Sequence, residues 1–245
     1  SDGLTMLDPE GNEIFIPGLS YSVSVVDQNN DDPVKALSYD VVVVHENCAS
    51  GSVGRGGDDG MYIDKPIPYL MMEQALVGGG AGKPGFMWFG SGGSTSTGYD
   101  DVVVLEDHPI TDFWGVGQSF PITKNENPSV SPIPYDNLAA GVTPLLDYPA
   151  ASGYMLSIAD EGATGFHDSP APPEGADPAP ARRAYLGYHE TVHVYNIDND
   201  ETMEDIAISK DGAILLQRLV QWLVGKEPTA DGTEQGVGLS DWSLY

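Results

Sequence analysis

Two short apolar runs constrain the fold of this chain more than any other feature. Residues 41–44 are four consecutive valines between Asp40 and His45, and residues 68–72 form a second apolar run. A strand with one face in water alternates apolar and polar residues, whereas a strand covered on both faces is apolar throughout. We therefore expect residues 41–44 to be a central strand of a parallel sheet and residues 68–72 to be another buried strand.

Other segments carry the signals of shorter elements. Asp32 and Pro33 are expected to begin a short helix through Leu37, because aspartate caps helix starts and proline fits the first helical position. Segments rich in Gly, Ser or Pro are expected to be surface loops, and a hairpin is expected where two apolar runs flank a turn. The expected strands are 21–26, 102–105, 153–158 and 184–188, the hairpin is 4–16, and the loops are 47–60, 90–98 and 169–180.

The strongest helix signal covers residues 209–225. Ser209 is a good N-cap, Asp211 suits the first helical turn, and Gly225 is a natural stop. The apolar residues between them recur at helical spacing, which predicts one face packed on the core. These residues are Ile214, Leu215, Leu219, Trp222 and Leu223.

Apolar strands separated by loops and helices predict an α/β protein. We expect a three-layer, flavodoxin-like, mostly parallel sheet with helices on both faces, an N-terminal hairpin within residues 1–18, and long surface loops. A chain of 245 residues fits a single domain, predicted here over residues 1–226. Residues 227–245 are then a polar C-terminal tail.

The charge of the chain restricts its partners. It has 37 acidic and 10 basic residues, which gives a net charge of −27. Nucleic acids and anionic membrane surfaces are poor partners for such a field, because their binding requires clustered Lys and Arg. No apolar run reaches the ~20 residues that span a bilayer, so no membrane insertion is expected. The scarcity of lysine, the 30 Gly and 19 Pro, and the many Asp and Asn residues fit an extracellular or cell-surface protein. The single cysteine, Cys48, rules out an intrachain disulfide and does not bear on the location.

Several segments, taken in order, resemble the class I glutamine amidotransferase-like superfamily. Together they extend over about residues 20–226. The sequence His108-Pro109-Ile110 is similar to a motif of the trehalose-utilisation-type relatives. The other matching segments are the strand at 40–46, the strand and turn at 68–73, the late strand at 183–190, and the closing helix at 209–225.

The resemblance also implies a change at the centre of the site. The family carries its catalytic cysteine on a tight strand-to-helix turn, and the matching position here is Glu73. His189 and Glu190 match the catalytic His and Glu of the late strand. A thiolate is required to attack the glutamine amide, so the resemblance implies a degenerate active site on a retained scaffold. The hairpin at 4–16 takes the place of the opening strand and helix of the family.

The chemistry of these residues leaves two interpretations. Glu73, His189 and Glu190 are expected to meet at the carboxyl ends of the strands, where open α/β sheets place ligands, with Glu46 and Asp27 at the same edge. They either activate water for the hydrolysis of a carbohydrate or ester, or form a relic pocket of mutually hydrogen-bonded groups.

Three other candidate sites are weaker. Cys48 either pairs with His45 or His189 or is an incidental thiol, and no basic cluster surrounds it. His189 and His193 share one face of a strand but lie ~13 Å apart, which is too far for one zinc ion. The candidate ligands for calcium are Asp198, Asp200 and Glu201, in an oxygen-rich loop whose alternative is a solvated acidic surface.

From these observations we expect a non-catalytic, acidic, extracellular module that binds or assembles. Its expected partners are copies of itself or other surface proteins. Two alternatives remain open: a hydrolase that uses Glu73, His189 and Glu190, and a calcium-stabilised carbohydrate-binding domain. Apart from calcium, no cofactor is expected.

Overall fold

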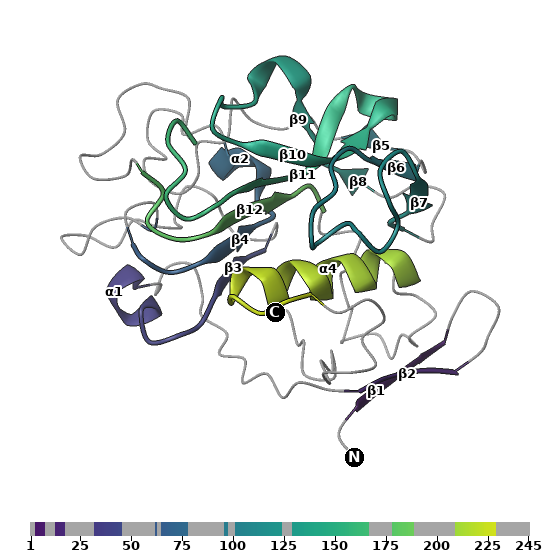
Figure 1. Ribbon diagram of the computed structural model, residues 1–245, viewed down its shortest axis with the longest axis horizontal. Coiled ribbons are helices and arrows are strands. Elements are labelled where there is room, and N and C mark those ends of the chain that lie inside the picture. Colours follow the sequence, from purple (N-terminus) through teal and green to yellow (C-terminus); the bar gives the residue numbers. More distant parts are fainter. Residues whose placement is uncertain are drawn as a thin grey trace.

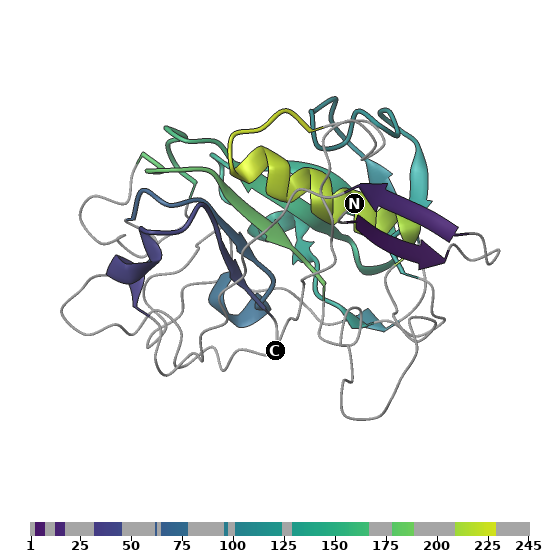
Figure 2. The ribbon, with the colours of Figure 1, turned by 90° about the horizontal axis from the view of Figure 1, so that it is seen from below.

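An open, mixed sheet of eight strands forms the centre of the α/β fold (Figure 1). The computed structural model describes residues 3–7, 13–17, 32–45, 62, 65–77, 96–97, 101–123, 129–166, 178–188 and 209–228. Seven strands follow one another in the order β3-β4-β12-β11-β10-β6-β7, and β9 pairs with β11 outside this order. A 14-residue helix, α4, runs along the sheet (Figures 1 and 2).

The strands of the main sheet are β3 (Val42–Val44), β4 (Tyr69–Met71), β6 (Asp101–Val104), β7 (Ser119–Pro121), β9 (Ile133–Pro134), β10 (Thr143–Tyr148), β11 (Gly153–Ala159) and β12 (Arg183–Leu186). Two separate pairs are β1 (Gly3–Leu7) with β2 (Glu13–Pro17), and β5 (Ser96–Thr97) with β8 (Ser129–Val130). The helices are α1 (Pro33–Ala36), α2 (Gln74–Val77), α4 (Lys210–Leu223) and the 3-10 turns η3 (Tyr135–Asn137) and η4 (Pro149–Ala151).

Most of the local predictions that fall on described residues are confirmed. β1 and β2 form the expected antiparallel hairpin, and β4, β6, β11 and β12 lie where strands were expected. Asp32 caps α1 by accepting hydrogen bonds from the Val34 and Lys35 amides at 2.9 and 3.0 Å. The loop predicted at 90–98 is wrong at Ser96 and Thr97, which form β5. Residues 21–26, 47–60 and 169–177 lie outside the described residues.

The prediction of a mostly parallel sheet is wrong for the described strands. Only β3 with β4 and β4 with β12 are parallel, whereas the other five pairs of this sheet are antiparallel. One cause is the short turn between β10 and β11, where η4 ends at Ser152 in the left-handed conformation at φ 50°. So short a connection joins antiparallel strands only. An unbroken apolar run favours burial on both faces, but it carries no information on strand direction.

The position predicted for the valine run also needs correction. β3 stands first in the order of the described strands, and Val42 and Val43 are half-buried while Val44 is buried. Among the described strands, β4, between β3 and β12, and β12, between β4 and β11, are buried at every residue. Cross-strand neighbours on both sides, supplied by distant parts of the chain, give β4 its central place.

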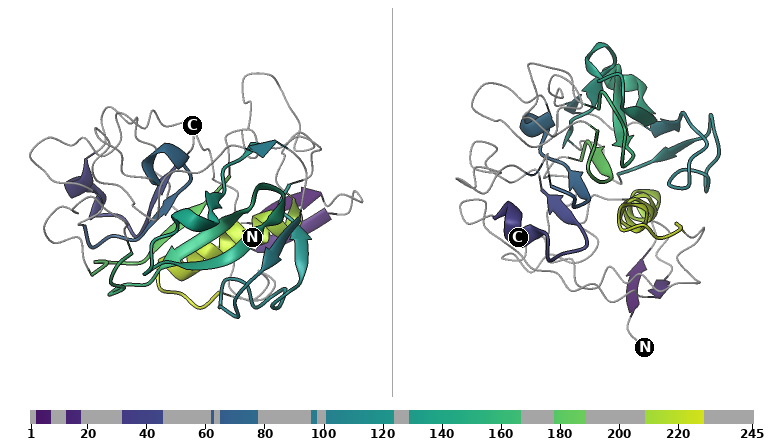
Figure 3. Two further views of the ribbon diagram at one scale, coloured as in Figure 1. Left: turned by 90° about the horizontal axis from the view of Figure 1, so that it is seen from above. Right: turned by 60° about the vertical axis from the view of Figure 1, so that its left-hand side comes forward.

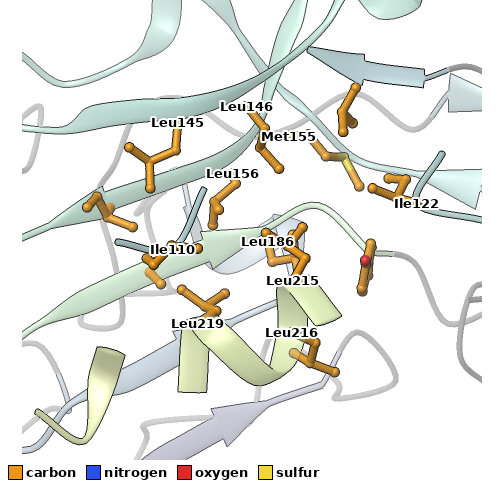
Figure 4. Close-up of a cluster of buried hydrophobic side chains, with 14 of the residues drawn as sticks. Ile110, Ile122, Leu145, Leu146, Met155, Leu156, Leu186, Leu215, Leu216 and Leu219 are labelled. Carbon is orange, nitrogen blue, oxygen red and sulfur yellow. The ribbon is translucent and has the colours of Figure 1, made fainter. Parts of the chain in front are cut away.

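The larger hydrophobic core lies between α4 and one face of the sheet (Figure 4). Leu215 and Leu219 of α4 meet Leu146, Leu156 and Leu186 of the strands in this core. The helix begins as predicted: the Ser209 hydroxyl accepts a hydrogen bond from the Gly212 amide at 2.8 Å. It ends just before Gly225, whose φ of 77° suits glycine.

The burial of α4 exceeds what its sequence indicated. Leu215, Leu219, Trp222 and Leu223 are buried as expected, and Ile214 is half-buried. Beyond that apolar face, Gln217 is 3% exposed and Arg218 and Gln221 are each 1% exposed. The helix is therefore covered around most of its circumference, and its polar residues require partners inside the protein.

A second core uses the alternate side chains of the same strands. Leu70 and Met72 belong to the first core, whereas Tyr69 and Met71 belong to the second. This alternation follows from the strand geometry, which directs successive side chains to opposite faces. The helical residues of the second core come from α1 and α2: Ala36, Leu76 and Val77. Figure 3 shows α1 and α2 away from α4 in a further view.

We predict that Gly141→Ala destabilises the protein by about 3 kcal/mol, because the new methyl group cannot be accommodated. A Cβ at this position would lie 2.0 Å from the Thr164 carbonyl oxygen and 2.6 Å from the Gly165 carbonyl carbon. The Gly141 amide also donates to the Gly165 oxygen at 2.7 Å, so the two backbone segments cannot separate without losing this bond. Urea unfolding measures the loss.

Gly162→Ala is the matched control. Gly162 has a φ of 83°, and no atom lies within 4 Å of the place that the new methyl group would take. The expected cost of Gly162→Ala is therefore that of the left-handed conformation alone, about 1–2 kcal/mol. Equal losses for the two variants would show that close backbone contact at Gly141 is not what determines its effect.

Candidate functional site

Glu73 lies in a tight strand-to-helix turn, as its sequence context predicted. β4 ends at Met71 and α2 begins at Gln74, so Met72 and Glu73 alone connect them. The Met72 amide donates to the Val44 oxygen at 2.8 Å, and the Leu76 amide donates to the Glu73 oxygen at 3.1 Å. These bonds fix the turn at both ends. The Glu73 side chain is buried, with 6% exposure.

His45 follows the neighbouring parallel strand. In the register of β3 and β4, Val44 pairs with Met71, so His45 stands level with Met72 and one residue before the level of Glu73. His45 is 8% exposed. A carboxylate and an imidazole are thus both buried at the carboxyl edge of two adjacent parallel strands, the edge at which open α/β sheets place ligands.

β12 leads toward the same edge. Tyr185 pairs with Met71 in a parallel register, and Tyr188 is the last described residue after the strand. The strand direction carries the chain toward the edge that holds Glu73. The remaining predicted site residues lie outside the described residues: His189, Glu190, Asp27, Glu46, Cys48, His193 and the calcium candidates Asp198, Asp200 and Glu201.

Arg183 is a residue whose role the sequence did not reveal. Its side chain is fully buried at the start of β12 and donates to the Ile67 oxygen at 2.6 Å and the Lys65 oxygen at 2.7 Å. Its guanidinium carbon lies 4.1 Å from the ring centroid of Tyr69. Burial raises the pKa of Tyr69, an effect that the nearby Arg183 charge opposes. Arg183 therefore anchors the segment that leads into β4 and, through β4, the Glu73 turn.

The residues at this edge, Glu73 and His45, are of types that transfer protons in enzymes. A buried carboxylate and an imidazole are residue types that donate and accept protons, provided that a substrate reaches them. In the part of the chain that the structure describes, no group of three His, Cys, Asp or Glu residues is arranged to hold a metal ion. In the same part, no helix is long and apolar enough to cross a membrane.

The His108-Pro109-Ile110 segment lies at the opposite edge of the sheet. It follows β6, and the pairings through β10, β11 and β12 make β6 run opposite to β4. The end of β6 is therefore far from the Glu73 turn. The structure therefore does not bring this segment and the Glu73 turn together.

The His108-Pro109-Ile110 segment contacts α4 rather than the Glu73 turn. Arg218 of α4 donates to the Ile110 oxygen at 2.9 Å and also to the Pro109 oxygen, and it forms an ion pair with Asp112. Burial lowers the pKa of Arg218, an effect that the Asp112 and Glu227 charges oppose. A buried arginine thus binds this segment to the helix.

His108 is half-buried beside the end of α4. Its Nδ1 accepts a hydrogen bond from the Ile110 amide at 3.2 Å, and its ring centroid lies 5.5 Å from that of Trp222, edge to face. Arg182 donates to the Trp222 oxygen, and its guanidinium carbon lies 4.8 Å from the Trp222 ring centroid. Burial lowers the pKa of His108 and Arg182 lowers it further, whereas Asp160 and Asp112 act in the opposite direction.

No family model matches this chain, and no curated protein sequence matches it either.

We predict that Arg218→Met destabilises the protein by about 3 kcal/mol, because two carbonyl groups lose a charged hydrogen-bond donor. Methionine keeps most of the side-chain volume, so packing changes little. Asp112→Asn is the control: the Asp112 side chain is 53% exposed, and asparagine keeps an oxygen that can accept from Arg218, so we expect a loss of about 1 kcal/mol or less. Chemical unfolding compares them. If Asp112→Asn cost as much as Arg218→Met, the ion pair would be the anchor rather than the carbonyl contacts.

We also predict a pH dependence of stability that arises from His108. The unfolded imidazole has a pKa of about 6.5, and the folded pKa lies below this value. As pH falls through the unfolded pKa, the unfolded state therefore binds a proton first, so stability decreases until the folded pKa is passed. His108→Asn should reduce this decrease between about pH 7.5 and 5.5. The measurement is the free energy of unfolding at several pH values, and an unchanged slope would contradict the assignment.

Proposed function

We propose that this chain is a non-catalytic, acidic, extracellular module that binds or assembles, built on a degenerate amidotransferase-like scaffold. The observation that carries the proposal is Glu73. It occupies a two-residue strand-to-helix turn and is 6% exposed. In the family that the sequence resembles, this is the position of a reactive cysteine, which must be accessible as a thiolate. A carboxylate in its place supplies no thiolate, and at 6% exposure it presents little surface to a substrate.

The two hydrophobic cores support the flavodoxin-like, three-layer part of the proposal. α4 contributes to the core that contains Leu70 and Met72, and α1 and α2 contribute to the core that contains Tyr69 and Met71. Since Leu70 and Tyr69 are successive residues of one strand, their side chains leave it in opposite directions. Parallel pairing of β3, β4 and β12 further supports an amidotransferase-like centre.

A rigid, apolar surface supports the assembly part of the proposal. Phe113 and Val116 are 42% and 55% exposed. Between them, Trp114 stacks on Phe120 with ring centroids 4.1 Å apart and donates to Asp211 at 2.8 Å. Together with the Arg218 contacts, these interactions hold the segment against α4. Preorganised apolar side chains of this kind lower the entropy cost of association, and we propose a second copy of the chain as their partner.

The hydrolase alternative has one observation in its favour. His45 and Glu73 are both buried just after β3 and β4, one residue apart in register, at the edge where the late strand also ends. In that alternative, Glu73 activates water with His189 and Glu190. It differs from the leading proposal in a simple respect, because it requires the Glu73 carboxylate for function.

We predict that self-association strengthens with salt. The net charge of −27 makes copies repel one another, and salt shortens the range of this repulsion from about 10 Å at 0.1 M to about 3 Å at 1 M. Sedimentation velocity across this salt range measures the assembly. Phe113→Ser with Val116→Ser should weaken it, whereas the matched pair Val34→Ser with Leu37→Ser, on another exposed segment, should not.

Experiments on the same purified protein distinguish self-assembly, the hydrolase and the calcium-stabilised domain. A chain that stays monomeric at every salt concentration would contradict assembly with itself. Hydrolysis of glycoside or ester substrates that disappears in Glu73→Gln would instead establish the hydrolase. A calcium-stabilised domain would show a rise in melting temperature with calcium that EDTA reverses and that Asp198→Asn with Asp200→Asn removes.

A further inference from the structure

Two tyrosines and an aspartate form an open corner on the antiparallel part of the sheet. We call Tyr135, Tyr154 and Asp147 the tyrosine corner. Asp147 of β10 and Tyr154 of β11 are direct cross-strand partners. Tyr135 begins η3 immediately after β9, and β9 pairs with β11 through Ile133 and Tyr154. Three segments of the chain therefore place these side chains together on a hydrogen-bonded framework.

The geometry of the corner is well defined. The rings of Tyr135 and Tyr154 have centroids 4.9 Å apart and planes inclined at 57°. The Tyr135 hydroxyl donates to the Asp147 carboxylate at 2.5 Å, and the Tyr135 amide donates to the Ser152 oxygen at 3.4 Å. These bonds restrain Tyr135 at its backbone and at the tip of its side chain. The residue is nevertheless 39% exposed.

The two rings make an ordinary aromatic contact, but burial of apolar area does not explain their exposed position. Aromatic rings are usually buried for their apolar area, but Tyr135 is exposed and Tyr154 is only half-buried. Within the described part of the chain, the Tyr154 hydroxyl has no hydrogen-bond partner, and the cation–π contacts are those of Arg182 with Trp222 and Arg183 with Tyr69. No described cation of the chain itself therefore occupies the tyrosine corner.

The electrostatics of the corner are negative. Aromatic faces carry the negative part of the ring quadrupole and attract cations within about 6 Å of the centroid. Asp147 adds a carboxylate beside them, and exposed Asp136 follows Tyr135. The net charge of −27 raises the concentration of cations around the whole molecule. Two inclined rings with a carboxylate thus suit a compact, weakly hydrated cation.

We propose that the tyrosine corner binds an organic ammonium group, with a quaternary trimethylammonium group as the preferred form. Its methyl groups can contact both inclined rings without losing hydrogen bonds, while Asp147 balances the charge. A metal ion would need several oxygen ligands, and the corner has one carboxylate, already engaged by Tyr135. A sugar stacks its flat face on one ring, so the inclination of the second ring offers it little. The inference does not depend on self-association or on Glu73.

The test uses choline and 3,3-dimethylbutan-1-ol, which has the same shape without the charge. A methyl group over an aromatic face is shielded, so protein should shift the trimethylammonium proton signal upfield in a saturable titration. Because each exposed ring contributes about a two- to five-fold gain in affinity, binding is expected in the millimolar range. The neutral isostere should show no saturable shift. Equal binding of choline and its isostere would overturn the proposal.

Matched variants locate the binding. Tyr154→Leu removes one ring and should weaken choline binding about two- to five-fold, whereas Tyr154→Phe keeps the ring and should bind like the parent. Asp147→Asn should weaken binding, and Asp40→Asn, an equal loss of charge before β3, should not. If Asp40→Asn weakened binding as much as Asp147→Asn, diffuse electrostatic attraction would explain the binding and the proposed site would be refuted. If Tyr154→Phe lost binding as Tyr154→Leu does, altered folding would explain the loss and the role of the ring would be refuted.

Glucose and N-acetylglucosamine serve as the last comparison. Saturable binding of either sugar at Tyr154, without binding of choline, would assign the corner to carbohydrates and refute the ammonium site. Circular dichroism of each variant confirms that it is folded before its binding is compared.

Discussion

Burial of α4 against the sheet is the constraint on which the other features depend. The helix supplies Leu215, Leu219 and Trp222 to the larger core, and Arg218 binds the segment after β6 to it. Arg182, just before β12, donates to the carbonyl oxygen of Trp222 near the helix end. Since the helix contacts the sheet and the loop at once, it sets the position of the exposed segment that we propose for assembly.

Two of the few basic residues of this acidic protein are buried, and their burial affects both its stability and its surface charge. The chain has 10 basic residues, yet Arg183 and Arg218 are almost fully buried, where backbone carbonyls accept their hydrogen bonds. Positive charge is thereby withdrawn from the surface, whereas most of the described carboxylates are exposed there. The outer field is consequently more uniformly negative than the composition alone indicates, which favours cationic ligands at the tyrosine corner and makes association between copies dependent on salt.

The candidate site could be predicted in part. Proline followed by an apolar run and Glu73 indicated a strand that enters a turn, and β4, Glu73 and α2 follow in that order. The role of Arg183 was not predictable, because the oxygens of Ile67 and Lys65 that it contacts lie more than a hundred positions away in the sequence. Tyr135, Asp147 and Tyr154 likewise meet only through the pairing of three strands, and no local pattern marks them.

Local chemistry specified the elements whose signals are contained within a few residues. The Asp32 and Ser209 caps, the β1–β2 hairpin and the apolar stripe of α4 belong to this group, because capping, turn formation and helical periodicity involve near neighbours. Long-range pairing was required for the mixed direction of the sheet, the first position of β3 among the described strands, and the burial of Gln217 and Arg218. Strand direction, strand order and depth of burial depend on which segments of the chain meet, whereas an apolar run indicates only a tendency to be covered.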